Sequence, residues 1–143
     1  MSCSSLTTAN FARCTSIGMS AFAYCRSLNS IYIPSCSSIS NGAFYYCDTL
    51  SIMNLPSCTY IATTVFQYCS SLMGLYLTAS SLCTLLNGNA FYYTPLSKSV
   101  NDVYGSIYVR ESLYSSYIVA TNWAAYSSRF VSMTDAEIEA LPF

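Results

Sequence analysis

Apolar and polar positions recur along this chain with a period of 22 residues. Within each copy, apolar and polar residues alternate over a short stretch, as the two-residue period of a β-strand requires. In the second copy the side chain that points outward is Tyr32. The inward positions of the same copy are Leu28, Ile31 and Ile33. Pro34 then predicts the end of the strand, because proline cannot donate to a ladder. Ile39 marks a second inward-facing stretch, so each copy predicts a coil with two short strands.

The copies align without a gap over the segments 21–39, 43–61 and 65–77. Phe44 and Cys47 lie one helical turn apart and are expected to point inward, and Gly42 and Gly88 are expected to form tight turns. The same register extends backwards, so the chain begins inside a repeat, as shown by Cys3, Leu6, Phe11, Cys14 and Ile17. One coil cannot bury its own apolar side, whereas coils stacked about 4.8 Å apart form a continuous core.

The motif A-F-x-x-C-x-x-L-x-x-I-x-I-P-x-x-x-x-I resembles the BspA-type (Treponema pallidum-like) leucine-rich repeat family of bacterial surface proteins. The resemblance covers nearly all of residues 3–133. It implies a repeat solenoid with parallel strands stacked one per coil, and a protein that binds host or partner proteins through its sheet face. It also implies an extracellular, cell-surface or virion location, on a bacterium or a phage. The motifs are specific for the fold and carry little information about function.

The C-terminal part resembles the usual ending of that family. A loop at 97–105 is expected to be an insertion, 106–109 the last strand, and 112–126 a short helical cap. This predicts a solenoid of four to five coils over 1–109 and a helical cap and tail over 110–143. The sequence departs from the family at Arg110, where proline is usual, and in the final eleven residues. Within those residues, Thr134 and Glu137 form the pattern of a capping box that opens a short helix.

Eight cysteines in a small domain would ordinarily suggest disulfides or a metal site. Seven of them, from Cys3 to Cys69, are spaced by eleven residues, which places one in each of two inward columns per coil. In-register neighbours have parallel Cβ vectors, which suit a disulfide poorly, and zinc sites prefer closely spaced pairs with histidine. The chain has no histidine. The pattern therefore favours a ladder of buried reduced thiols. Disulfides are the second interpretation and a metal site is the third.

Charge and residue content argue against several functions. The net charge of −1 gives no basic surface for nucleic acid or an anionic membrane. No apolar run approaches the roughly 20 residues that span a bilayer, and no signal peptide is visible at the N-terminus. Without histidine no Ser-His-Asp triad is possible, and no phosphate-binding glycine loop or paired carboxylate site is evident. We expect no catalytic residues, no metal and no cofactor. The sequence leaves open a cytoplasmic protein, a virion component or a piece of an exported protein.

One outward position of the main strand forms a candidate binding face, with one residue per coil: Asn10, Tyr32, Asn54, Tyr76 and Tyr108. Tyrosine offers a large amphipathic contact area at low entropic cost, although tyrosine also favours strands for its own sake. Both interpretations stay open. A second tyrosine column is expected to pack between coils and comprises Tyr24, Tyr46, Tyr68 and Tyr93.

The N-terminal coil shows no capping device, so its strand is expected to present an unpaired edge and exposed core. The residues of this candidate assembly edge are Leu6, Asn10 and Phe11. Three explanations fit: a fragment of a longer array, a two-fold dimer, or a head-to-tail filament, the last two requiring a complete chain. The sequence therefore predicts a non-enzymatic protein-interaction or adhesion module, with a self-assembling structural subunit as the alternative. The partner is a protein or a second copy of the chain.

Overall fold

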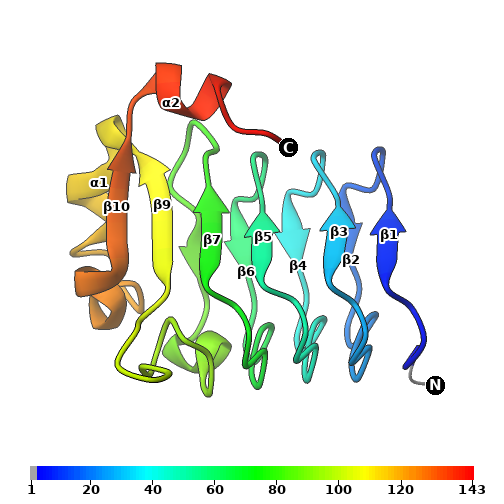
Figure 1. The fold of residues 1–143 in the computed structure, drawn as a ribbon. Coiled ribbons are helices and arrows are strands. Elements are labelled where there is room, and N and C mark those ends of the chain that lie inside the picture. The colour runs from blue at the N-terminus through cyan, green and yellow to red at the C-terminus, as the bar shows by residue number, and fades with distance from the viewer. Residues whose placement is uncertain (1–2) are drawn as a thin grey trace.

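Residues 3–143 of the computed structural model form a solenoid of stacked coils that is closed at one end by helices (Figure 1). The strands are β1 (Thr8–Asn10), β2 (Ser16–Ile17), β3 (Ser30–Tyr32), β4 (Ser38–Ile39), β5 (Ile52–Asn54), β6 (Tyr60–Ile61), β7 (Gly74–Leu77), β8 (Thr84–Leu85), β9 (Ser106–Arg110) and β10 (Phe130–Met133). The helical segments are η1 (Gly88–Phe91), α1 (Glu111–Tyr117), η2 (Ala124–Arg129) and α2 (Asp135–Glu139). The expected repeat solenoid with a short helical cap is confirmed.

Each of the first four coils contributes one strand to the front face and one to the back face, and β9 and β10 extend the front face alone. The front sheet contains the pair β1-β3 and the set β5-β7-β9-β10, and the back sheet has the order β2-β4-β6-β8. Thr8 pairs with Ser30 and Ile17 with Ile39, so strand neighbours are offset by one 22-residue repeat. The two short strands predicted for each coil are therefore present, and strand neighbours come from successive coils.

The core is a column of equivalent side chains, one from each coil. The rings of Phe22, Phe44, Phe66 and Phe91 stack at centroid separations of 5.4, 5.5 and 5.5 Å. Phe44 and Cys47 are both fully buried, as their spacing predicted. A fully buried phenylalanine or leucine stabilises the fold by about 1.5–3 kcal/mol, so the repeated column supplies much of the stability.

A closing turn completes each coil on the third side, and it contains left-handed backbone. Gly42 has φ of 62°, which a glycine adopts without strain. Gly88 begins the 3₁₀ segment η1 and has no positive φ, so the turn there does not depend on the conformational freedom of glycine. The left-handed positions recur at the second tyrosine column instead, with φ of 59–64° at Tyr24, Tyr46, Tyr68 and Tyr93. Each such non-glycine residue costs roughly 1–2 kcal/mol, which the surrounding hydrogen bonds and stacking must offset.

The cap covers the last coil with α1 and η2, and its side chains bind the edge of the back sheet. The Tyr117 hydroxyl accepts a hydrogen bond from the Cys83 amide at 2.9 Å, and Trp123 Nε1 donates to the Cys83 carbonyl at 2.6 Å. Asn122 Nδ2 donates to the carbonyls of Leu85 and Leu86 at 2.8 and 3.0 Å. Tyr117 and Trp123 are buried. The cap thus satisfies ladder groups that a further coil would otherwise pair.

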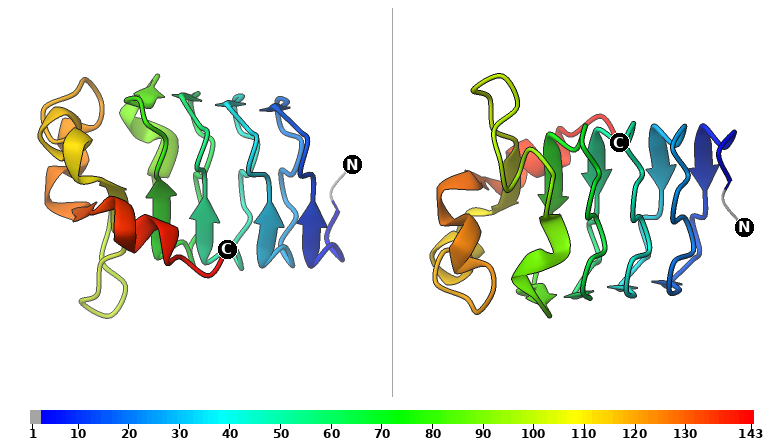
Figure 2. Two further views of the ribbon diagram at one scale, coloured as in Figure 1. Left: turned by 90° about the horizontal axis from the view of Figure 1, so that it is seen from above. Right: turned by 90° about the horizontal axis from the view of Figure 1, so that it is seen from below.

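The C-terminal residues add a strand that the sequence did not predict. The expectation that 106–109 is the last strand was wrong, because β10 pairs in parallel with β9, Phe130 opposite Ile107 and Met133 opposite Arg110. Helix α2 follows β10, and the tail then runs back over the front sheet towards β5 (Figure 2). The predicted capping box at Thr134 and Glu137 is present.

The front sheet is interrupted between β3 and β5. Neighbouring strands pair on both sides of this position, but no ladder joins β3 to β5. Figure 1 and Figure 2 both show these two strands farther apart than the other neighbours in the front sheet. The back sheet stays continuous there, with Ile39 opposite Ile61. The coils are therefore joined along the back and open at the front.

Candidate protein-binding face

The outward column of the front sheet follows the strand register. Asn10 lies opposite Tyr32, Asn54 opposite Tyr76, and Tyr76 opposite Tyr108. The Tyr76 and Tyr108 rings stack with centroids 4.3 Å apart and an interplanar angle of 11°. Burial and the neighbouring Tyr108 raise the pKa of Tyr76, so the Tyr76 hydroxyl stays neutral at physiological pH. The structure thus places all five predicted residues on the front sheet, in two groups separated by the interruption.

The chain's own tail covers part of this face. Phe143 packs edge-on against Tyr76 with centroids 5.2 Å apart and an interplanar angle of 75°. Tyr32 is 47% exposed, whereas Tyr76 and Tyr108 are half-buried. No signal in the repeat motif pointed to Phe143, because the final eleven residues lie outside the family pattern.

A cleft of about 350 Å³ lies on the front sheet at the interruption. Its walls come from the facing edges of β3 and β5, and Phe143 completes them. The apolar lining side chains are Ala9, Ile31, Ile33, Pro34, Ile52, Tyr32 and Phe143. Asn54 also lines the cleft, and its Oδ1 is buried and accepts no hydrogen bond from any residue described in the structure. We call this cleft the β3–β5 slot.

The predicted assembly edge lies at the opposite end from the cap. Phe11 is 44% exposed and contacts Phe22 at a centroid separation of 5.8 Å, at the open end of the phenylalanine column. Asn10 is exposed and Leu6 is half-buried. A pocket of about 200 Å³ beside Phe11 is lined by Cys14, Ser16, Ile17, Gly18, Ala21 and Phe22. Within residues 3–143, β1 pairs only with β3.

The second tyrosine column stacks along the closing turns, as expected for packing between coils. Ring centroids are 5.4 Å apart for Tyr24 and Tyr46, 4.3 Å for Tyr46 and Tyr68, and 4.5 Å for Tyr68 and Tyr93. Arg26 lies over the Tyr46 ring at 5.0 Å and pairs with Asp48 at 3.4 Å. The close stacking accounts for the tyrosines at these strained positions.

The thiols lie in two columns and are free in this structure. Cys47 Sγ donates to the Phe22 carbonyl at 3.1 Å and Cys69 Sγ to the Phe44 carbonyl at 3.0 Å, so each of these thiols joins its coil to the preceding one. In the other column, Cys83 Sγ donates to Cys58 Sγ at 4.0 Å. Burial raises the pKa of Cys36 to about 11 and that of Cys47 to about 12. These thiols therefore stay protonated and poorly nucleophilic at neutral pH.

Across residues 3–143 no group of three or more histidine, cysteine, aspartate or glutamate side chains is arranged to hold a metal ion. The three acidic residues near the C-terminus lie on or beside α2 and are exposed. Glu137 belongs to the capping box, and Asp135 pairs with Arg110. Of the helices that the structure describes, none has the length and apolar character needed to cross a membrane.

Parallel strands that repeat along the coils on two faces, with an inward Leu-x-x-Ile-x-Ile column, define a leucine-rich-repeat solenoid. The BspA type leucine rich repeat region matches residues 1–116 in six copies, and the chain belongs to this family. No curated protein matches the chain. Leucine-rich repeats of this kind are typically non-enzymatic scaffolds for protein–protein interaction.

Proposed function

We propose that the chain is a protein-interaction and adhesion module of a bacterial or phage surface, and that it binds its partner through the front sheet. The observation that carries this proposal is the outward column of Asn and Tyr side chains in strand register. Tyrosine is among the residues that contribute most to binding energy at interfaces. Parallel strands hold these side chains at fixed spacing, so little conformational entropy is lost on binding.

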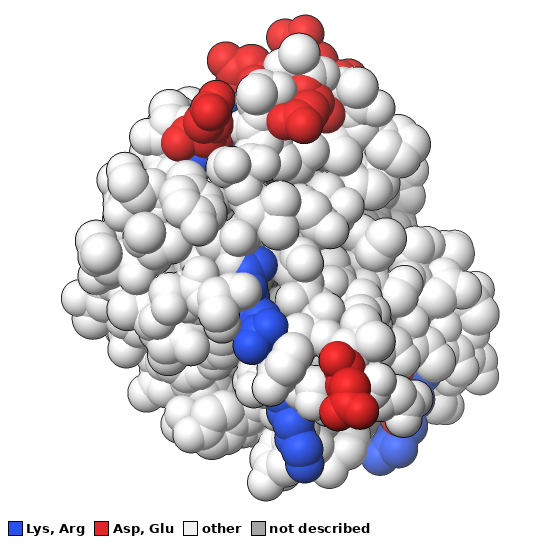
Figure 3. Space-filling model, turned by 60° about the vertical axis from the view of Figure 1, so that its left-hand side comes forward, with Lys and Arg blue, Asp and Glu red and all other residues white. Residues whose placement is uncertain are grey.

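The distribution of charge supports a partner that is recognised by aromatic and hydrogen-bonding contacts. Only three charged residues precede Lys98: Arg13, Arg26 and Asp48. Figure 3 shows most of the acidic side chains in that view gathered at one end of the molecule, another acidic side chain near the basic ones at the other end, and wide areas without charge. Association would therefore gain little from electrostatic steering and would depend weakly on salt.

The double substitution Tyr32→Ser with Tyr76→Ser tests this proposal. A partner isolated on the immobilised chain is purified, and its affinity is measured for the wild type and the variant. Each tyrosine at the centre of an interface contributes on the order of 2 kcal/mol, so the double variant should bind at least roughly 100-fold more weakly. The matched control is Tyr24→Ser with Tyr92→Ser, which removes two exposed tyrosines from the closing turns. Equal binding by the two double variants would reject the front sheet as the contact surface.

A second candidate function is self-assembly through the N-terminal edge. The observation that favours it is the difference between the two ends of the solenoid. At the capped end, Asn122 and Trp123 bind the edge of the back sheet, whereas at the N-terminal end Phe11 is 44% exposed. Because the cap occupies the back-sheet edge, this contrast favours a two-fold dimer over a head-to-tail filament. Sedimentation across micromolar concentrations tests it. Phe11→Lys should convert a dimer to monomer, and a wild type that is monomeric throughout would reject the idea.

A further inference from the structure

The β3–β5 slot contains backbone groups that are paired at every equivalent position nearby. The amide of Met73 donates to the Ser51 carbonyl at 2.9 Å, and the amide of Asn29 to the Thr7 carbonyl at 2.9 Å. The equivalent amide between these coils belongs to Ser51, and within the described chain it donates to no group.

The other end of the slot shows the same absence. Leu55 donates to the Tyr76 carbonyl at 2.9 Å and Phe11 to the Tyr32 carbonyl at 2.9 Å, but the equivalent amide of Ile33 has no acceptor among residues 3–143. Ile33 is only 1% exposed, so water is a poor substitute. Buried backbone donors are almost always paired in folded proteins.

The β3–β5 slot cannot accommodate an additional β-strand. The back sheet holds the same two coils together, since the Thr59 amide donates to the Ser37 carbonyl at 2.8 Å. Inserting a strand would need a second spacing of about 4.8 Å between these coils. The slot therefore admits a side chain between β3 and β5, together with single hydrogen bonds at its rims.

We propose that the β3–β5 slot is a binding site for an aromatic side chain carried on an extended peptide. The peptide groups beside the ring would donate to Asn54 Oδ1 and accept from the Ser51 amide, while Ile31 and Ile52 contact the ring. The proposal rests on the function assigned above to the front sheet, and it names one site and one ligand class on that sheet.

The occupant is indicated by the chain itself. Phe143 lies at the mouth of the slot, follows residues 141–142, which belong to no helix or strand, and also packs on Tyr76. Phe143 is still 46% exposed and Asn54 Oδ1 is still unpaired, so the tail covers the slot without filling it. The tail thus acts as an intramolecular competitor for peptides of the same kind. No charged residue lines the slot, which disfavours anionic ligands.

A fluorescently labelled peptide with the sequence Glu-Ala-Leu-Pro-Phe, amidated at its C-terminus, is the probe. Anisotropy is recorded with the full chain and with Phe143→Ser. The variant should bind the probe about tenfold more tightly than the wild type, because a tethered competitor acts at millimolar effective concentration. A probe that ends in serine should bind neither protein.

Two matched variants locate the site. Ile52→Glu, in the Phe143→Ser background, places a charge in the slot wall and should abolish probe binding. Val131→Glu introduces the same charge at a similarly exposed β-branched residue on β10 and should leave binding unchanged; the two residues are 45% and 40% exposed. Circular dichroism confirms that both variants are folded.

Failure to detect probe binding to the Phe143→Ser variant, or equal loss with both glutamate variants, would overturn the proposal. A probe that binds equally well with phenylalanine or serine at its end would also overturn it. These outcomes can be told apart from failure of the proposed function. That function is tested by the affinity of a purified protein partner for the Tyr32→Ser, Tyr76→Ser variant, and a partner that contacts Tyr76 and Tyr108 can bind without occupying the slot.

Discussion

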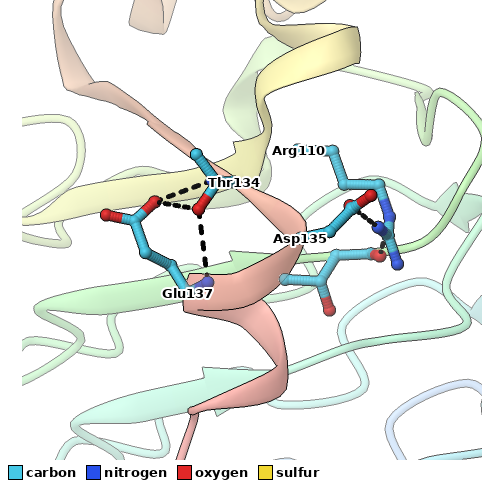
Figure 4. Close-up of polar contacts among 5 residues, drawn as sticks. Arg110, Thr134, Asp135 and Glu137 are labelled. Atoms are coloured by element: carbon cyan, nitrogen blue, oxygen red, sulfur yellow. Dashed lines mark hydrogen bonds and ion pairs between the residues drawn. The ribbon is translucent and has the colours of Figure 1, made fainter.

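The guanidinium of Arg110, at the end of β9, pairs with the carboxylate of Asp135, the first residue of α2 (Figure 4). Its Nε also donates to the Thr78 carbonyl at 2.7 Å, which ties the same side chain to the preceding coil. Arg110 and the final eleven residues are the two places where the sequence departs from its family pattern. The structure shows that they are in contact, because the ion pair joins the end of β9 to the first residue of α2.

The substitution Arg110→Met should release α2 and the tail while leaving the solenoid folded. Asp135 is largely exposed, so the ion pair contributes about 1 kcal/mol or less to global stability. Hydrogen exchange should accelerate in residues 135–141, with little change in the denaturation midpoint. Arg26→Met removes an ion pair elsewhere and should leave exchange in α2 unchanged. Unaltered exchange in the Arg110 variant would show that β10 alone positions the tail.

The capping box makes the tail helix sensitive to acid. Hydrogen bonds from the Thr134 amide and hydroxyl lower the pKa of Glu137 below its ordinary value of 4.5. A carboxylate with a lowered folded-state pKa stabilises the helix fully above its ordinary value, and the stabilisation is lost as pH falls through the lowered pKa. Amide exchange and chemical shifts of α2, followed from neutral pH to below that range, should therefore report fraying in acid.

Two variants isolate the residue responsible for this acid response. Glu137→Gln retains the geometry of a capping box without a titrating group, so the fraying should no longer depend on pH. Glu139→Gln should retain the wild-type response. A Glu137→Gln protein that still frays at the same pH would assign the effect to another group.

Hydrogen exchange also tests the opening of the front sheet. The Ser51 amide lacks the hydrogen bond that its repeat equivalent, the Met73 amide, makes at 2.9 Å. Both residues are exposed, so they are a matched pair. One backbone hydrogen bond contributes about 1 kcal/mol, and Ser51 should exchange roughly fivefold to tenfold faster than Met73 after correction for intrinsic rates. Equal protection would mean that β3 and β5 pair in solution.

The period of the sequence predicted the coil, the two sheets and the inward columns, because every copy must satisfy the same packing. It could not predict the slot, since Leu28 and Leu50 begin copies with the same motif residues on both sides of it. The interruption depends on how two coils stack, which is a property of the pair. Likewise, the residues around Phe130 did not predict its pairing with Ile107, because parallel pairing joins residues that are separated in the chain.

Thiol reactivity should separate the cysteines by position. Cys3 is exposed and Cys14 half-buried, whereas the other six are buried. Burial raises the pKa of the Cys47 thiol to about 12, which suppresses the reactive thiolate. Iodoacetamide followed by mass spectrometry should therefore modify Cys3 quickly, Cys14 more slowly, and the rest only in denaturant. A mass deficit before labelling, or rapid labelling of Cys47, would contradict a ladder of buried reduced thiols.

Among the cap residues, substitution of Trp123 should lower the free energy of unfolding most. Its indole is 1% exposed, contacts Phe91, Tyr117 and Phe130, and donates to the Cys83 carbonyl. Trp123→Ala should lower the free energy of unfolding by about 3–5 kcal/mol. The variant leaves a cavity at the end of the core, and the carbonyl of Cys83, the residue before β8, loses its hydrogen bond. Trp123→Phe keeps most of the volume and should cost less, roughly 1–3 kcal/mol. Urea denaturation measures both values. A loss below about 1 kcal/mol for the alanine variant would show that the solenoid's last coil is stable without its cap.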